Sequence, residues 1–251
     1  IDGHIGFCGG VNFSEDYGST RHGNGRLHDA HVKVEGPCVR DLAAVLASSI
    51  WMASDDETNL PLPQRAAKAG ETFVQVLASR GREGRRAIQR SIRLTIRHAT
   101  QHCWITTPYF IPPPRLIRAI NSAAARGVDV HILTAGDSDV PIVRTAAQHI
   151  YGLLLKRGVR IHEMFGVTLH AKTMTVDGLY STVGSFNLDT WSHKRNLEVM
   201  LGMVDADVAR LMREQFGRDL ALTKEVTLET WKRRNLWQRI VHWAAYQVMR
   251  I

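Results

Sequence analysis

An internal repeat limits the possible folds of this chain more than any other feature. Residues 1–12 align without a gap on residues 176–187, and each copy has an Asp-Gly pair, an apolar stretch and a Gly-small-x-Asn turn. An acidic residue follows in each copy, Asp29 in the first and Glu198 in the second, ahead of a segment typical of a strand and a helix. A repeated supersecondary unit predicts two related halves. Two unrelated β-hairpins that share common turn residues are the alternative.

Outside the repeat, apolar periodicity predicts alternating strands and helices. The expected strands cover 5–13, 31–35, 72–78, 103–107, 128–134, 159–163, 168–176, 180–184 and 197–203. The expected helices cover 38–52, 83–101, 115–126, 140–157, 205–219 and 227–250. This alternation favours an α/β layered fold. Residues 54–70 contain two prolines, three acids and few large apolar side chains, so we interpret them as a linker.

The composition restricts the class of partner. The 251 residues include 32 Lys and Arg against 24 Asp and Glu, which gives a net charge of +8 with His neutral. This excess points to an anionic partner: nucleic acid, a phosphorylated small molecule or an anionic membrane surface. No apolar run reaches the roughly 18 residues of a membrane-spanning helix. Three scattered cysteines without a Cys-x-x-Cys pair favour a reducing compartment over a disulfide framework.

The second repeat copy carries the residues that suggest chemistry. His170 and Lys172 lie two apart on an expected strand, so both side chains should project from one face. Asp177 follows at the strand end, and Ser185 and Asn187 come after the return strand. An imidazole serves as nucleophile or general acid, an ammonium neutralises phosphoryl oxygens, and hydroxyl and amide groups donate hydrogen bonds. Together these groups suit a tetrahedral phosphate.

The spacing His-x-Lys-x4-Asp-x6-Gly-Ser-x-Asn resembles the signature of the phospholipase D superfamily. Segments 107–112, 126–128, 158–160 and 184–189 further resemble the bacterial cardiolipin synthase branch of that superfamily. Pro113-Pro114 differs from that branch, which commonly has an acid at this point. The resemblance covers nearly the whole chain. It implies a phospholipase D-like α/β fold with two pseudo-symmetric halves, each a mixed β-sheet flanked by helices, of which the first is incomplete.

The resemblance also divides the chain. Residues 1–53 are interpreted as the remnant of a first half, 54–70 as a linker, 71–226 as a second half and 227–251 as a basic amphipathic helix. The His and Lys of the first motif would precede Ile1. A chain with half of the catalytic pair is expected to be inactive by itself.

The mechanism that the resemblance implies uses two histidines. One attacks the phosphodiester phosphorus and forms a phosphohistidine, while the other protonates the leaving alcohol and then deprotonates the incoming one. By this likeness His170 is the general acid and base, and Lys172 and Asn187 bind the phosphate with support from Ser185.

Further roles follow from the same resemblance. Asp177 is expected to orient a histidine, and Asp2 and Asn12 match the Asp and the phosphate-binding Asn of the first motif. Glu198 is expected to support the catalytic groups without contacting the phosphate itself. The chemistry needs no metal ion and no other cofactor.

The implied function is transfer of a phosphatidyl group from one phosphatidylglycerol to the hydroxyl of another, peripherally on the cytoplasmic side of a bacterial membrane. The motif does not fix the acceptor. Hydrolysis of a phospholipid or a nucleic acid is therefore one alternative, and a non-catalytic membrane-binding fragment is another.

The carboxy-terminal stretch is rich in tryptophan and basic residues. Trp231, Trp237 and Trp243 lie on a broad apolar face, with Lys232 and Arg239 among the cations around it. Such a helix suits the interface of an anionic membrane, and docking on its own domain is equally consistent with the pattern. The resemblance favours contact with an anionic phospholipid such as phosphatidylglycerol over nucleic acid. The pattern does not predict an oligomeric state.

Overall fold

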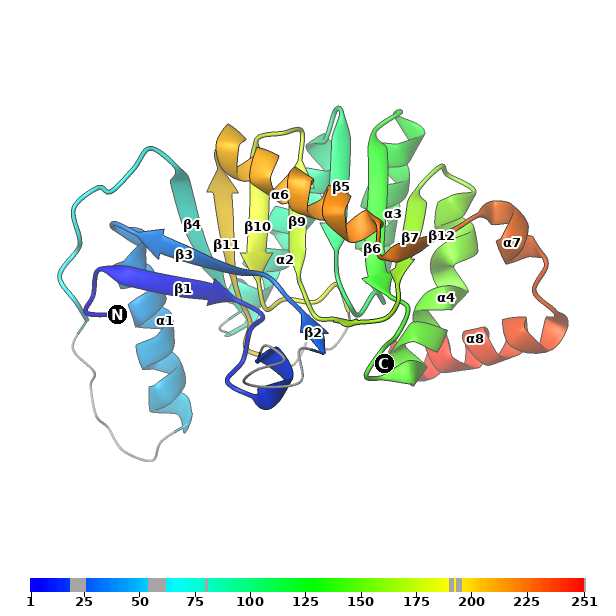
Figure 1. Cartoon of the computed structure of the whole chain (residues 1–251), viewed down its shortest axis with the longest axis horizontal. Helices are drawn as coiled ribbons and strands as arrows, with labels where there is room; N and C mark the ends of the chain where they lie inside the picture. The colour runs from blue at the N-terminus through cyan, green and yellow to red at the C-terminus, as the bar shows by residue number, and fades with distance from the viewer. Residues whose placement is uncertain (19–25, 54–61, 80, 190–191, 193–195, 251) are drawn as a thin grey trace.

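An eight-stranded mixed sheet forms the centre of the molecule (Figure 1). The computed structural model describes residues 1–18, 26–53, 62–79, 81–189, 192 and 196–250. The strands lie in the order β12 (Thr223–Val226), β7 (Arg160–Met164), β6 (Asp129–Ala135), β5 (His102–Thr106), β9 (Thr173–Val176), β10 (Tyr180–Gly184), β11 (Val199–Val204) and β4 (Phe73–Ala78). Strands β5, β6 and β7 are parallel, and the other neighbours are antiparallel. The predicted α/β class is confirmed.

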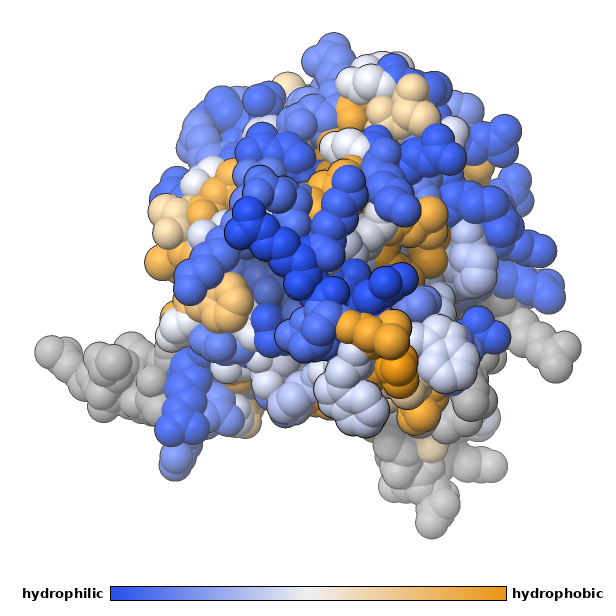
Figure 2. Space-filling model, turned by 90° about the vertical axis from the view of Figure 1, so that its right-hand side faces the viewer, coloured by the Kyte–Doolittle hydropathy of each residue, from blue (hydrophilic) through white to orange (hydrophobic). Residues whose placement is uncertain are grey.

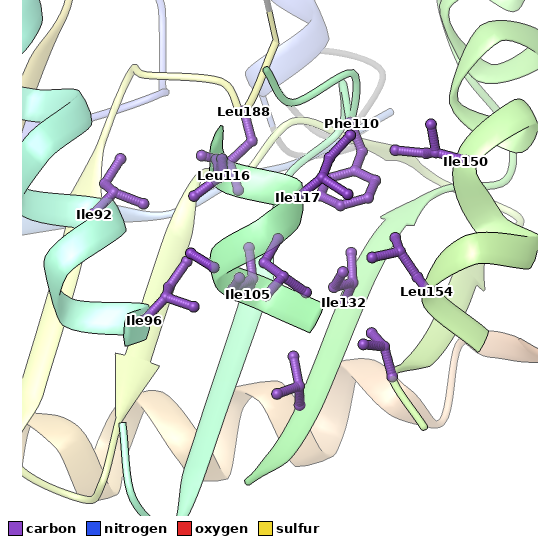
Figure 3. Close-up of a cluster of buried hydrophobic side chains, with 14 of the residues drawn as sticks. Ile92, Ile96, Ile105, Phe110, Leu116, Ile117, Ile132, Ile150, Leu154 and Leu188 are labelled. Carbon is purple, nitrogen blue, oxygen red and sulfur yellow. The ribbon is translucent and has the colours of Figure 1, made fainter. Parts of the chain in front are cut away.

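Helices cover both faces of this sheet. One face packs against α2 (Gly81–His98), α3 (Pro114–Ala125) and α4 (Pro141–Leu155), and α6 (Ala206–Leu220) lies on the other (Figure 1). The main core lies on the first face, where isoleucines of α2 and α3 meet Ile105 of β5 and Ile132 of β6 (Figure 3). Both α3 and α4 start with a proline at the first helical position, where its fixed φ and missing N–H carry no cost.

A smaller unit packs on the same face as α6 (Figure 1). It consists of the antiparallel strands β1 (Ile5–Gly9) and β3 (His31–Glu35) and the helix α1 (Cys38–Ala53). Its apolar side chains join those of β10 and β11 in a second core of Cys8, Val34, Cys38, Val39, Val183, Leu201 and Met203. A short helix, η1 (Glu15–Tyr17), and a two-residue strand, β2 (Leu27–His28), carry the chain towards β8 (Thr168–Leu169), with which β2 pairs in parallel.

The repeat seen in the sequence recurs in the backbone. Gly9 pairs with His31 as Gly184 pairs with Met200, so the β1–β3 and β10–β11 ladders have the same register relative to the alignment. A Cβ on Gly9 would lie 2.3 Å from the Ala30 carbonyl oxygen, and one on Gly184 would lie 2.2 Å from that of Val199. Both hairpins also start from an aspartate with positive φ, 50° in the first and 52° in the second.

Two predicted segments are wrong in detail. The strand expected at 168–176 is divided into β8 and β9, with His170 in the gap. The helix expected at 227–250 is divided into α7 (Leu228–Lys232) and α8 (Leu236–Met249), because Asn235 begins a new helix with a capping box. Strand β12 precedes α7 and was not predicted; its Glu225 forms an ion pair with Arg160 of β7. None of the helices in the described part of the chain combines the length and apolarity needed to cross a membrane.

Candidate active site

The candidate site lies at the edge of the sheet where β5, β6 and β10 end and β9 begins, the lower edge in Figure 1. The backbone N–H groups of His170 and Ala171 both donate to the His28 carbonyl oxygen, at 2.8 and 3.1 Å. These two hydrogen bonds to β2 turn the chain and end β8. The sequence predicted that His170 and Lys172 share one face of a single strand, but both residues lie between β8 and β9. The Lys172 ammonium instead folds back and donates to the His170 carbonyl oxygen.

An acid from the amino-terminal unit orients the His170 ring. The Asp29 carboxylate lies 2.7 Å from His170 Nδ1, and its side chain is 2% exposed. The Tyr17 hydroxyl lies 2.9 Å from the same nitrogen and donates to the Gly10 carbonyl oxygen at 3.2 Å. Since both neighbours of Nδ1 can accept, the hydrogen-bond pattern assigns the proton to Nδ1. The lone pair of Nε2 is then available for chemistry.

The room for Asp29 depends on a glycine. Its Oδ1 atom accepts from the Ala30 backbone N–H at 2.7 Å, which fixes the carboxylate. A Cβ on Gly10 would lie 2.5 Å from the same oxygen. Any side chain at position 10 would thus push Asp29 away from His170. The charge of Asp29 also acts on the partly buried Tyr17 hydroxyl: together with partial burial, which contributes more, it raises the pKa of Tyr17 to about 12.

Lys172 supplies a buried positive charge on which the charges of nearby acids act. Lys172 is 5% exposed. Burial lowers the pKa of Lys172 to about 8, and the charges of Asp29 and Glu198 limit that fall. The ammonium is thus mostly protonated at neutral pH, in surroundings of low polarity where a cation attracts a phosphate strongly.

Glu198 lies in a second cluster at the same edge. Its carboxylate accepts from the Ser185 hydroxyl at 2.5 Å, from the Ser192 hydroxyl at 3.0 Å and from the Asn196 amide at 3.1 Å. The Ser185 oxygen in turn accepts from the Val199 backbone N–H at 3.1 Å. Ser185 therefore holds Glu198, which is compatible with the supporting role expected for both.

The two asparagines differ in burial. Asn187 is 7% exposed, and in the part of the chain that the structure describes its Oδ1 atom has no hydrogen-bond partner. This oxygen accepts hydrogen bonds, so a ligand with a donor group, such as a hydroxyl, would complete it, and phosphoryl oxygens would need the Nδ2 donor of the same amide. Asn12 is exposed, and its amide nitrogen lies 3.4 Å from the Tyr17 hydroxyl. Both positions thus adjoin the site, one buried and one at its surface.

Asp177, expected to orient a histidine, is placed elsewhere. It follows β9 at the opposite edge of the sheet, about 16 Å along the strand from Lys172 at 3.3 Å per residue. Its carboxylate accepts backbone N–H groups from Thr100, Gln101 and His102 at 2.8 to 3.0 Å. Burial alone would raise the pKa of Asp177, but these donors outweigh it and lower the pKa. The role inferred from sequence is corrected: Asp177 fixes the turn between α2 and β5.

The role predicted for Asp2 is corrected as well, because the structure places it away from the site. It precedes β1, whereas Gly10 and Asp29 lie beyond the other end of that strand. The five residues of β1 alone span roughly 16 Å, so the Asp2 carboxylate is remote from His170. Its likeness to Asp177 concerns the turn, since both have a positive φ.

Comparison with known proteins identifies the family. Residues 92–220 match the family model described as cardiolipin synthase, PLD-like domain, which is 129 of the 251 residues. The chain belongs to this family. It is 32% identical over 251 residues to cardiolipin synthase A of Yersinia pseudotuberculosis, covering 96% of this chain and 50% of that protein. It is 29% identical over 247 residues to cardiolipin synthase of Clostridium perfringens, covering 96% and 52%. The chain thus spans about half the length of the curated relatives it matches.

Solved structures share the fold. Phosphatidylserine synthase of Haemophilus influenzae aligns with a TM-score of 0.64 at 16% identity, over 89% of this chain and 63% of that one. Nuc of Salmonella typhimurium, a phospholipase D family member, aligns with a TM-score of 0.53 at 21% identity, over 62% and 99%. At these identities the likeness shows that the chain shares the fold of these proteins. It does not show which substrate the chain uses.

Two residues of the candidate site in this family member were missed from sequence. Asp29 was recognised as the repeat partner of Glu198 but was not assigned to the site, although that correspondence is the signal that could have placed it there. Tyr17 lies in a polar loop without periodicity, and nothing in the sequence points to it.

Proposed function

We propose that the full-length protein carrying these residues transfers phosphatidyl groups between phospholipids through a phosphohistidine intermediate, as a cardiolipin synthase. The observation that carries the proposal is the contact of Asp29 with His170. Among the described residues it leaves one imidazole nitrogen, Nε2, without a partner, at an edge that also holds the Lys172 ammonium and the buried Asn187 side chain. Anionic phospholipids are the substrates proposed, because cardiolipin synthases are the relatives found.

In the proposed reaction, His170 Nε2 first donates a proton and later accepts one. The protonated ring gives its Nε2 proton to the leaving alcohol while the other motif histidine forms the P–N bond and the P–O bond breaks. The neutral ring then takes the proton of the incoming hydroxyl, whose oxygen attacks phosphorus as the P–N bond breaks. Asp29 stabilises the imidazolium in the first stage and holds the ring in both. Lys172 and Asn187 bind the phosphoryl oxygens throughout.

The internal symmetry suggests where the other histidine acts. Glu198 precedes β11 as Asp29 precedes β3, and the charges of both acids act on Lys172 and limit the fall of its pKa. If the halves are equivalent, Glu198 is the acceptor for the second imidazole, as Asp29 is for His170. This gives the proposed division of the chain: 1–53 as part of one half, 54–70 as a linker, 71–226 as the other half and 227–251 as an appended helix.

Among the described residues, one histidine, His170, contacts Asp29, and the partners of the Glu198 carboxylate are Ser185, Ser192 and Asn196. A relay of two histidines requires a second ring. We therefore expect residues 1–251 alone to show no turnover, and turnover of that chain, abolished by His170→Asn, would refute the two-histidine mechanism.

The decisive experiment is thin-layer chromatography of lipids after incubation of the full-length protein with phosphatidylglycerol vesicles. Cardiolipin and glycerol are the expected products. Phosphatidic acid without cardiolipin would replace transferase by hydrolase, and cleavage of single-stranded DNA without lipid turnover would replace lipid by nucleic acid. His170→Asn should abolish the product. His98→Asn, at an exposed histidine that ends α2, is the matched control and should leave it unchanged.

We further propose peripheral contact with the membrane through α8, on the cytoplasmic side. The helix packs on α4 through Ala245 and Tyr246, whereas Trp237 is 70% exposed and Trp243 53% exposed on its other side. The two sequence interpretations are thus compatible, since one face docks and another is left for an interface. Trp237→Ser should weaken flotation with phosphatidylglycerol vesicles without changing the unfolding temperature, and equal flotation of the variant would contradict the contact.

A further inference from the structure

A cavity of about 570 Å³ lies between α4, α7 and α8, at the end of the molecule away from the β1–β3 unit (Figure 1). Four cationic side chains line it, and none of its lining residues is acidic: the cations are Lys156, Lys232, Arg234 and Arg239. Apolar side chains complete the wall: Leu228, Trp231, Leu236, Ile240 and Trp243. A cavity with several cations and no carboxylate attracts an anion, because a bound anion relieves the repulsion among the cations.

Arg234 is held in a fixed orientation at this cavity. Its Nε–H donates to the Trp231 carbonyl oxygen at 2.9 Å, and its guanidinium lies 3.0 Å from the centroid of the Trp231 ring. Its Nη1 atom lies 3.0 Å from His242 Nδ1. Burial lowers the pKa of Arg234 to about 10, and the charge of Arg239 contributes. Stacking thus orients this cation in the absence of an acidic partner among the lining residues.

The nearby acid on α7 does not neutralise the cavity. Glu229 forms an ion pair with Arg233 at 2.5 Å, and both side chains are largely exposed. Neither residue lines the cavity. The positive charge of the lining is therefore available to a ligand.

An exposed apolar surface adjoins the cavity. One side of α8 presents, at helical spacing, Leu236, Trp237, Ile240, Val241, Trp243 and Val248, all of them exposed. Leu236, Ile240 and Trp243 belong both to this surface and to the cavity wall. Figure 2 shows this end of the molecule, where a cluster of hydrophobic residues lies below a broad hydrophilic area. Helix α8 also lies at the lower side of Figure 1, as does the sheet edge that holds the candidate active site.

We propose that the cavity binds the phosphate of an anionic phospholipid while the acyl chains of that lipid lie against the exposed side of α8. The occupant is argued from complementarity: the cations match a phosphodiester, and the tryptophans and aliphatic side chains match the boundary between headgroups and acyl chains. This headgroup site is distinct from the site of His170. It anchors the protein with its catalytic edge towards the membrane and does not take part in group transfer.

The test compares two double variants in vesicle flotation with the full-length protein. Lys232→Gln with Arg239→Gln removes two cations from the cavity wall. Arg233→Gln with Arg250→Gln removes two exposed cations from the same end without touching that wall. With phosphatidylglycerol in phosphatidylcholine vesicles, the first pair should weaken binding about 10-fold or more beyond the second. Equal weakening by both pairs would overturn the site in favour of diffuse surface charge.

Two further measurements separate the sources of phosphate and the two proposals. Inorganic phosphate titrated calorimetrically should bind weakly and compete little with vesicles. Tight binding of free phosphate that the cavity variant abolishes, with unchanged flotation, would overturn the lipid assignment. Cardiolipin formation from detergent-dispersed phosphatidylglycerol should be unchanged in the cavity variant, so failure of the headgroup site and failure of the proposed function give different results. Matching unfolding temperatures of both pairs establish that the variants are folded.

Discussion

The two acids of the repeat, Asp29 and Glu198, occupy corresponding backbone positions and have different partners. Asp29 contacts the His170 imidazole, and the residue beside its carboxylate is a glycine, Gly10. Glu198 contacts three hydrogen-bond donors, among them the hydroxyl of Ser185, which corresponds to Gly10 in the alignment. The backbone of the repeat therefore sets where an acid stands, and the side chains brought by other segments set what it does.

The difference follows from what reaches each acid. The turn between β8 and β9 brings His170 to Asp29, because two backbone N–H groups of that turn are bonded to β2. At Glu198 the neighbouring donors come from its own half. Under the proposed symmetry each acid would accept from a histidine, and among the described residues Asp29 has one in place. The following variants test how far this correspondence holds.

The largest effect is expected from the acids and His170 in the full-length protein. His170→Asn should lower cardiolipin formation by about 10²–10⁴-fold, the usual contribution of a general acid–base group. Asp29→Asn should lower kcat by on the order of 10², since it removes the carboxylate that fixes the tautomer and stabilises the imidazolium. If the halves are equivalent, Glu198→Gln should have an effect like that of Asp29→Asn. Full activity of Glu198→Gln would break the correspondence.

Exchanging the residues beside the acids is the next test. Gly10→Ser introduces the residue of the second copy, but its Cβ would lie 2.5 Å from Asp29 Oδ1 and displace the carboxylate from His170. We expect a loss of kcat of about 10-fold or more, with a pH profile altered in the limb that reports His170. Ser185→Gly is the reciprocal control and should cost less, because Glu198 keeps two other donors. The reverse ranking would show that Gly10 does not make room for Asp29.

Lys172→Met should raise stability, although it removes a charge that is proposed to bind the phosphate. The ammonium has a pKa of about 8 in the folded protein against 10.5 in the unfolded chain, so the folded state disfavours the charge. The free energy of unfolding should rise by about 1–3 kcal/mol at pH 7. Since the unfolded chain holds the proton longer, the wild type gains stability from pH 8 to pH 10.5, and the advantage of the variant should shrink in that window. Thermal melts at pH 7 and 10 measure this; a variant less stable at pH 7 would contradict it.

The smallest effect is expected at the two turn aspartates. Asp177→Ala should lower the free energy of unfolding by about 1–3 kcal/mol more than Asp2→Ala, because Asp177 accepts three backbone N–H groups. Both residues have positive φ, so the backbone strain of alanine is matched and cancels in the difference. Urea denaturation measures it. Equal losses would mean that the bonds to the turn between α2 and β5 contribute nothing beyond the turn itself.

Much of the fold was predictable because its signals act over a few residues. Apolar periodicity located the strands at 31–35 and 180–184 with the ends that the structure has, and it located α1, α3 and α6 within two residues. The repeat predicted two related units, and the structure adds that β1–β3 and β10–β11 have the same register. The His-x-Lys pattern located His170 and Lys172, because their side-chain chemistry is characteristic at that spacing.

The partners of these residues were not predictable in the same way. The Asp29–His170 contact joins residues 141 positions apart, and it exists because β2 pairs with β8 and brings the two loops together. Asp177 was placed in the site by analogy, yet a strand separates it from Lys172. The two sides of α8 look alike in sequence, and packing on α4 selects which is buried. Periodicity and turn chemistry are local properties of the chain, whereas the choice of partner depends on which surfaces the folded chain brings within a few ångströms.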